Sequence, residues 1–459
     1  MNFKQYHGLI LEGGAYGHMM NVYEDYSLTF QDMYNLIEKW FTGGITEAKE
    51  KTDGQALAVS YRAGNVIFAR NKGHYVGFGK NALKGARGLV SFFGDHPNEN
   101  VAAAFVKAGK DLETAMKALS PAQLDKLFGD GSRWVNIEII WPGTTNVIPY
   151  YEGDGVSKRR LIVLHNYREY DETGNTVGGD FDEYGRMMAG MLKQRGVNYQ
   201  TDFEIMSMPM FKIADLKGDD GTRVVDNFSE NKLEYHGRLQ NIKNQFGLTE
   251  QNTVGDSWIA HMYQVLNQAK QQNNFAIADS TLNKVAYRWA YKKLPAAKRP
   301  PQYSSQAITR IGDLKNEVGT NGKDFLNWVS AFEKDKQRFD AEFSNMLNPL
   351  RSLFLDMGVE ICSHMVSMLT LHPSIAAQEI RIGLQDAIKS VKNSENELNW
   401  SKVDAEIQKI KQAGGFDKII PSEGLTFTFT PEDGEQRIYK FTGVFAPANQ
   451  ILGIGKFSR

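Results

Sequence analysis

The chain has 459 residues, of which 41% are apolar and 11% aromatic, enough to bury a sizeable core. A length of this size allows two to three domains, or one domain with a large insertion. The 53 lysine and arginine residues nearly balance the 54 aspartate and glutamate residues, and the formal net charge of -1 excludes a strongly basic nucleic-acid coat but allows a local basic groove.

Helix and strand patterns alternate through the first 180 residues. Two segments repeat apolar residues at helical spacing: 30–41 and 97–128. Five segments rich in β-branched and aromatic residues are predicted strands: 56–61, 66–70, 134–140, 146–150 and 160–167. Ala63-Gly64-Asn65 lies between the first two strands and predicts a hairpin turn.

From about residue 180 to 414 the pattern becomes helical. Its clearest amphipathic segments are 257–271, 323–343 and 374–391. The last predicted strands are 425–429, 437–444 and 451–457. We therefore predict an α+β fold. Residues 1–180 and 415–459 would form one domain of mostly antiparallel sheets with flanking helices, and residues 181–414 a large α-helical insertion domain.

Lys51-Thr52-Asp53-Gly54 stands just before the predicted hairpin. A lysine attacks the α-phosphate of a nucleoside triphosphate only as the neutral amine, which requires desolvation or a nearby cation. Gly54 would let the backbone pass close to a nucleotide. The alternative is an ordinary surface turn, because Asp-Gly is a favoured turn pair and the run at 49–51 could be solvated.

Further segments follow this motif in order. They are 70–73 (Arg-Asn-Lys-Gly), 135–150 around Glu138, 160–169, 423–427 (Glu-Gly-Leu-Thr-Phe) and 439–443 (Tyr-Lys-Phe-Thr-Gly). In this order they resemble the motifs of the covalent nucleotidyltransferase superfamily, which contains RNA ligases, DNA ligases and mRNA capping enzymes. The similarity is greatest to phage-type RNA ligases of the tRNA-repair kind. It covers roughly 1–180 and 418–459, and residues 17–25 also resemble phage proteins.

The resemblance implies a ligase-type nucleotidyltransferase fold and an ATP-dependent RNA ligase that acts through a covalent lysyl-AMP intermediate. Lys51 would carry the AMP and Lys440 would be the second catalytic lysine, with Lys456 as an alternative for that role. The nucleotide-binding residues would be Asp53, Gly54, Arg70, Lys72, Glu138, Glu423 and Lys440. Glu138 and Glu423 would hold Mg²⁺, since Mg²⁺ prefers oxygen ligands.

Two departures leave the acceptor open. Ala56 stands where many DNA ligases have an arginine, which favours RNA over DNA ends, and Thr442 replaces the second lysine usual in the last motif. One alternative is a nucleotidyltransferase with a non-polynucleotide acceptor. Another is a non-catalytic phage structural or binding protein that reuses the fold. The oligomeric state stays open.

One basic stretch in the helical middle could contact nucleic-acid phosphates, with aromatic residues near it to stack on bases. Its residues are Lys292, Lys293, Lys298 and Arg299. Equally, basic residues at a helix end complement the helix dipole. With nine histidines and one cysteine, no zinc-ligand spacing is present, and His165 stands isolated in the sequence.

The sequence also indicates a compartment. The single cysteine, Cys362, excludes a disulfide framework within the chain and is typical of a reducing environment. No run approaches the roughly 18 apolar residues of a membrane span, and residues 1–6 do not resemble a signal peptide. We therefore expect a cytoplasmic protein that binds no membrane, in an infected host if the chain is phage-encoded.

Overall fold

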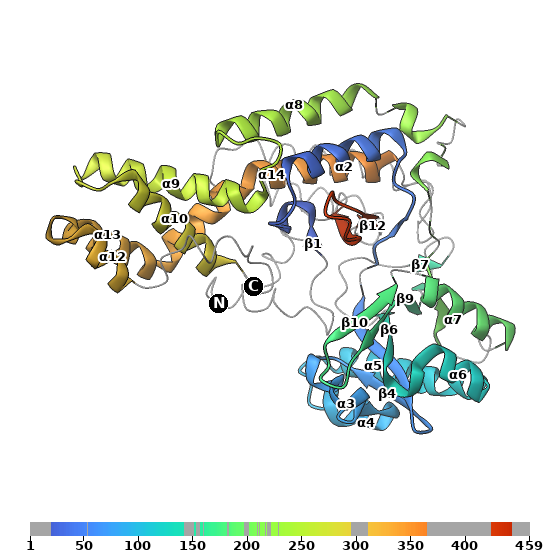
Figure 1. Ribbon diagram of the computed structural model, residues 1–459. Coiled ribbons are helices and arrows are strands. Elements are labelled where there is room, and N and C mark those ends of the chain that lie inside the picture. Colours follow the sequence, from blue (N-terminus) through green and yellow to red (C-terminus); the bar gives the residue numbers. More distant parts are fainter. Residues whose placement is uncertain are drawn as a thin grey trace.

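The structure is a computed structural model in which α-helices and β-sheets are mixed, so the predicted α+β class is confirmed (Figure 1). It describes residues 20–52, 54–141, 151–152, 157–158, 160–180, 183–196, 202–208, 210, 212–215, 217, 222–227, 229–294, 311–364 and 424–442. The predicted strands at 146–150 and 451–457 and the predicted helix at 374–391 lie outside these residues.

A four-stranded sheet joins segments from near both ends of the chain. Its order is β1 (Met20–Asn21), β13 (Arg437–Thr442), β12 (Gly424–Phe429) and β2 (Ala48–Glu50). Strand β12 pairs antiparallel with both neighbours, whereas β1 runs parallel to β13. One face of this small sheet is apolar, since Phe427, Tyr439 and Phe441 are all buried there.

Helices cover the apolar face of the small sheet and extend away from it (Figure 1). They are α2 (Phe30–Thr42), α8 (Ser229–Gln245), α9 (Val254–Gln272), α10 (Asp279–Lys293), α12 (Ile311–Val318), α13 (Lys323–Lys334) and α14 (Lys336–His364). The segment 323–343, predicted as one helix, is two helices. Asp335 breaks it with a non-helical φ of -77° and ψ of 81°.

The described fold also contains a short antiparallel pair, β7 (Tyr151–Glu152) with β8 (Ser157–Lys158), and a seven-stranded sheet. Its main order is β10 (Thr176–Asp180), β9 (Leu161–Tyr170), β6 (Arg133–Ile140), β3 (Gln55–Arg62), β4 (Asn65–Ala69) and β5 (Leu83–Lys84), with β11 (Glu204–Met206) beside β9. The helices beside it are α3 (Val76–Gly79), α4 (Gly85–Phe93), α5 (Glu99–Lys117), α6 (Pro121–Phe128) and α7 (Glu183–Gln194). The predicted hairpin is confirmed, and Ala63 and Gly64 make its turn with φ of 46° and 79°.

Two large hydrophobic cores group the segments differently from the predicted domains. One core contains residues of α2, of the helices from α8 to α14 and of β12 and β13. The other lies between the large sheet and its helices, and residues of α7 and β11 belong to it. Residues 20–48 therefore pack with the helical middle, and 188–205 pack with the large sheet. The domain boundaries at 180 and 415 stay a prediction.

Trp40 joins α2 to the small sheet. Its side chain is fully buried, and its ring meets Phe427 at 5.0 Å and Phe441 at 5.1 Å between centroids. Trp40→Ala is expected to lower the free energy of unfolding by about 3–5 kcal/mol, because it leaves a cavity in the core. Thr42→Ala, an exposed change on the same helix, should cost no more than about 0.5 kcal/mol. The measurement is urea unfolding of both variants. An equal loss of unfolding free energy in the two would contradict this packing.

No helix in the described part of the chain combines the length and the apolar character that a bilayer crossing requires.

Candidate functional site

Lys51 stands where the chain leaves the small sheet for the large one. Strand β2 ends at Glu50 and β3 begins at Gln55, so residues 51–54 link the two sheets. The Lys51 N–H donates to the Gly424 carbonyl at 2.8 Å, which continues the pairing of β2 with β12. Its half-buried side chain donates from Nζ to the Thr52 carbonyl at 3.3 Å. The predicted nucleophile thus lies at the junction of the sheets. Asp53, predicted to bind the nucleotide, lies outside the described residues.

Glu138 on β6 holds this link from the side of the large sheet. Its Oε1 accepts the Gly54 N–H at 2.9 Å, and its Oε2 accepts the Thr52 hydroxyl in a short hydrogen bond. His165 Nε2 lies 3.2 Å from the same Oε2 and 3.5 Å from the Thr52 hydroxyl oxygen. The Glu138 side chain is only 18% exposed. One carboxylate therefore fixes both the residue after Lys51 and the motif glycine.

Position 54 requires glycine for a reason that the structure makes visible. A Cβ there would stand 2.7 Å from Glu138 Cγ and 2.8 Å from the Ile139 carbonyl oxygen, closer than van der Waals contact permits. The structure shows a close approach of Gly54 to strand β6, and its predicted approach to a nucleotide stays a prediction. A larger residue would push the link away from Glu138.

Strand register explains how His165 reaches Glu138. Glu138 pairs with Val163 on β9, and His165 is two residues further along the same strand. Because side chains alternate between the faces of a strand, Val163 and His165 share a face with Glu138. His165 was judged isolated from the sequence. The sequence shows which residues alternate along the strand at 161–170, but it does not show that this strand pairs with β6.

The environment of Glu138 has opposing effects on the pKa of its carboxyl. Burial alone would raise the pKa, but the hydrogen bond and charge of His165, the charge of Lys51 and the Thr52 hydroxyl together hold it below its usual value of 4.5. The carboxylate form is therefore the stable one near neutral pH.

This shift predicts the pH dependence of stability. A carboxyl group whose pKa is lowered by folding stabilises the fold above its usual pKa, and that stabilisation is lost as the pH falls through the lowered value. Glu138→Gln should therefore lower the melting temperature near pH 7, and its difference from the natural chain should begin to shrink as the pH falls below 4.5, the usual pKa of the carboxyl, and vanish only below the lowered pKa. Thermal unfolding at a series of pH values measures this. A difference that stays constant down to pH 3 would speak against the charged clamp.

Three lysines share one face of the small sheet. Lys440 on β13 lies directly opposite Thr426 on β12, and Thr426 lies opposite Lys49 on β2. Lys51 follows Lys49 by two residues, just beyond the end of β2, and strand alternation continued past Glu50 would place it on the same side. Glu50 points to the opposite side and is only 2% exposed, so the run at 49–51 is not simply solvated. Lys49 was missed as a candidate because its strand is only three residues long.

The sequence matches no protein-family model and no curated protein. What these residues do is therefore inferred from their geometry and charge.

The other predicted nucleotide-binding residues are spread more widely. Arg70 directly follows β4, and its guanidinium donates to the Ala56 carbonyl at 2.5 Å, next to the strand pair that carries Glu138. Lys72 is exposed and donates from Nζ to Asn175 Oδ1 at 3.1 Å. Glu423 and Lys456 lie outside the described residues, although Gly424 begins β12 beside Lys51. The structure thus joins Lys51, Gly54 and Glu138 and leaves Lys72 on the surface.

Glu138 has little capacity left for a metal ion. An ionised carboxylate offers about four lone-pair positions, and Thr52, Gly54 and His165 occupy three of them. In the part of the chain that the structure describes, no group of three or more His, Cys, Asp or Glu side chains is arranged to hold a metal. These residues fit a Mg²⁺ ion held mainly by substrate phosphates and water, with one protein carboxylate at most.

The α10 lysines that were predicted to contact nucleic acid form ion pairs with carboxylates of the chain itself. Lys292 Nζ lies 2.6 Å from Glu333 Oε2, and Lys293 forms an ion pair with Asp340. Lys298 and Arg299 lie outside the described residues. A role in nucleic-acid binding there stays a prediction, but Lys293 is paired with Asp340, and Lys292 shares Glu333 with Arg288.

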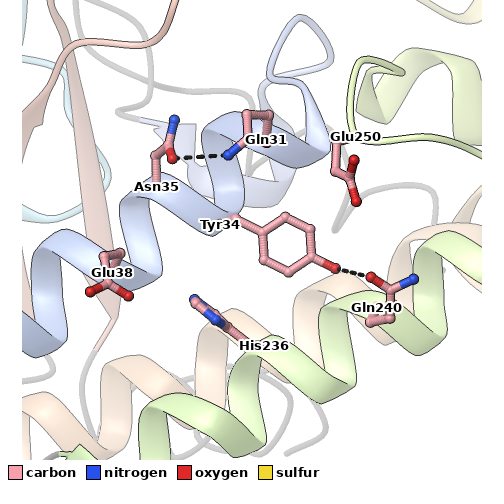
Figure 2. Close-up of a pocket in the computed structure, with 7 residues that line it drawn as sticks. All are labelled: Gln31, Tyr34, Asn35, Glu38, His236, Gln240 and Glu250. Atoms are coloured by element: carbon pink, nitrogen blue, oxygen red, sulfur yellow. Dashed lines mark hydrogen bonds between the residues drawn. The ribbon is translucent and has the colours of Figure 1, made fainter.

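A pocket of about 410 Å³ lies between α2 and α8 (Figure 2). It is lined by Gln31, Tyr34, Asn35, Glu38, His236, Gln240 and Glu250. The Tyr34 hydroxyl donates to Gln240 Oε1 at 2.9 Å, and Gln31 Nε2 donates to Asn35 Oδ1 at 3.0 Å. Burial lowers the pKa of His236, which favours its neutral form. None of the predicted site residues lines this pocket, so it is separate from the Lys51 site.

Proposed function

We propose that this chain is an ATP-dependent nucleotidyltransferase of the ligase type, in which Lys51 becomes covalently attached to AMP and RNA ends are the acceptor. One observation carries the proposal. Lys51 sits in the link between two mainly antiparallel sheets, tied to Gly424 on one side and, through Thr52 and Gly54, to Glu138 on the other. A nucleophile anchored on both sides keeps its position better than one on a mobile loop.

The first step would be attack of Lys51 Nζ on the α-phosphorus of ATP. The neutral amine forms a nitrogen–phosphorus bond, the bond from that phosphorus to the bridging oxygen breaks, pyrophosphate leaves, and the proton released from the nitrogen passes to solvent water. Lys49 and Lys440, on the same sheet face as Lys51, are placed to balance phosphate charge. When bound with ATP, Mg²⁺ would neutralise further phosphate charge.

The negative charge of Glu138 also works against this step. It interacts with Lys51, and the same attraction favours the charged ammonium, which cannot attack. An opposing positive charge is therefore needed at the moment of reaction. The two neighbouring lysines and the cation that accompanies ATP would supply it. We accordingly expect little reaction without a divalent cation.

In the following steps the AMP would pass from Lys51 to the 5′-phosphate of an RNA strand, and a 3′-hydroxyl would then displace AMP to join the two ends. Positioning and charge neutralisation would provide most of the acceleration. The sheet faces that carry Lys51, Lys440 and Glu138 would contact the nucleotide in the first step.

The test is labelling of the purified chain with ATP and Mg²⁺. Label in the α-phosphate should remain on the denatured protein, survive alkali and be lost in acid, as a lysine phosphoramidate is. Label in the γ-phosphate should not remain, because it leaves with pyrophosphate. Adding 5′-phosphorylated RNA should discharge the adduct. An adduct that RNA fails to discharge would overturn the proposed acceptor, and no adduct with any nucleoside triphosphate would overturn the enzyme.

A further inference from the structure

Residues 55–94 are strongly basic within a chain that is nearly neutral overall. This stretch contains six lysine and arginine residues and no aspartate or glutamate. The six are Arg62, Arg70, Lys72, Lys80, Lys84 and Arg87. Such a local excess is the electrostatic footprint of a surface that meets a polyanion.

Four of these side chains are exposed, and the fold explains why. Arg62 and Arg70 are partly buried and donate to backbone carbonyls, so they serve the fold. The exposed four follow one another on the 3-10 helix η2 (Lys72–His74), the end of α3, β5 and α4, at the edge of the large sheet beyond β4. Figure 1 places α3 and α4 at the end of the molecule furthest from α8. We call Lys72, Lys80, Lys84, Arg87 and Phe92 the basic surface.

The same surface exposes apolar side chains. Among the described residues, five large hydrophobic side chains stand out as exposed, and Val76, Val90 and Phe92 are three of them. Phe92 is 45% exposed, and its ring lies edge-on to His74 with 5.4 Å between centroids, which joins the end of α4 to η2. Within the described residues, Lys72, Lys80, Lys84 and Arg87 form no ion pair, and an exposed aromatic ring beside such positive charges is a combination with which proteins hold single-stranded nucleic acid.

The helical region gives a useful contrast. Lys292 and Lys293 there each contact a carboxylate, Glu333 and Asp340, although Glu333 is shared with Arg288. Near the basic surface, the described carboxylate of Glu113 accepts the Ala86 N–H at 3.1 Å and so serves to cap α4. Charge complementarity therefore favours the basic surface over the helical region as the place for a polyanion.

We propose that the basic surface binds single-stranded RNA, with Lys80, Lys84 and Arg87 on phosphates and Phe92 stacked on a base. Arg70, two residues before Lys72, donates to the Ala56 carbonyl, and Ala56 pairs with Glu138, so the segment that carries the basic surface starts next to the strand pair of Glu138. The identity of the bound strand as the acceptor rests on the proposed function. Binding itself does not, so it can be measured on a chain that cannot react.

The experiment uses the full chain carrying Lys51→Ala and a fluorescent 5′-phosphorylated single-stranded RNA, with fluorescence anisotropy at several salt concentrations. Lys84→Glu with Arg87→Glu should weaken binding at least about tenfold and reduce the steepness of the salt dependence by about 1.4 in log–log slope, the value for two lost phosphate contacts on a single strand. Phe92→Ala should weaken binding about fivefold or more, with little change in that slope.

The matched control is Lys334→Glu with Lys336→Glu, which changes the charge equally at exposed positions on the helical region. It should leave the dissociation constant within about twofold of the parent chain, because it removes no phosphate contact. Equal losses from both charge reversals, or no salt-dependent binding by the parent, would overturn the proposal. Tighter binding of duplex than of single-stranded RNA would overturn the role of Phe92. RNA binding without any AMP adduct on the natural chain would instead refute the proposed function alone.

Discussion

Lys51→Ala is expected to abolish covalent labelling by ATP, because no other residue would supply the attacking nitrogen. Lys51→Arg should fail as well, since a guanidinium stays protonated at any accessible pH and is no nucleophile. The measurement is the amount of α-phosphate label on the denatured protein after a fixed time with ATP and Mg²⁺. Lys51→Ala shortens a half-buried side chain just beyond the end of β2, and Lys51→Arg keeps its positive charge there, so the fold should persist.

Lys49→Ala is the matched control for this change. Lys49 carries the same charge on the same face of the small sheet, two residues earlier. Its loss should slow labelling by about tenfold through weaker phosphate attraction, without abolishing it. Full labelling of Lys51→Ala, or equal loss from the two alanine variants, would contradict the assignment of the nucleophile.

Glu138→Ala is expected to reduce the rate of AMP attachment about 100-fold, because the link that carries Lys51 loses the carboxylate that positions it. The change removes acceptors for the Gly54 N–H and the Thr52 hydroxyl and the partner of His165. We describe Glu138 as a positioning residue, since its oxygens are directed at the protein. The measurement is the single-turnover rate of adduct formation at saturating ATP.

Glu138→Gln separates geometry from charge. The amide oxygen can still accept one hydrogen bond, so this variant should lose only about tenfold and recover part of the alanine defect. His165→Ala should change the rate less than Glu138→Ala, because it leaves the bonds from Thr52 and Gly54 in place. If glutamine and alanine at 138 behaved alike, or if His165→Ala were the most damaging change, the positioning role would be wrong.

Local features of the fold could be predicted from the sequence because their causes are local. The hairpin followed from a Gly64 turn between two runs of strand-forming residues. The structure divides the predicted helical segment 97–128 into α5 and α6, and Ser120 caps α6 with Gln123 completing the capping box. The break at Asp335 was missed, because Phe332 and Phe339 on either side both pack in the core and keep the apolar pattern unbroken.

Long-range arrangement was the harder part. Nothing local to α2 says that Trp40 packs against Phe427 and Phe441, almost 400 residues later. The candidate site shows the same difference between what local sequence predicts and what only long-range pairing reveals. Lys51 and Glu138 were named from residue types in order, whereas His165 and Lys49 became candidates only when strand register placed them beside those two.

The most direct measurement is the location of AMP on the natural chain. After reaction with ATP and Mg²⁺, the protein is digested under alkaline conditions that preserve a phosphoramidate, and the peptides are sequenced by tandem mass spectrometry. We predict a single AMP group on Lys51, in the segment that links the two sheets. AMP found on Lys49, Lys440 or any other residue, or no modified peptide at all, would contradict Lys51 as the nucleophile.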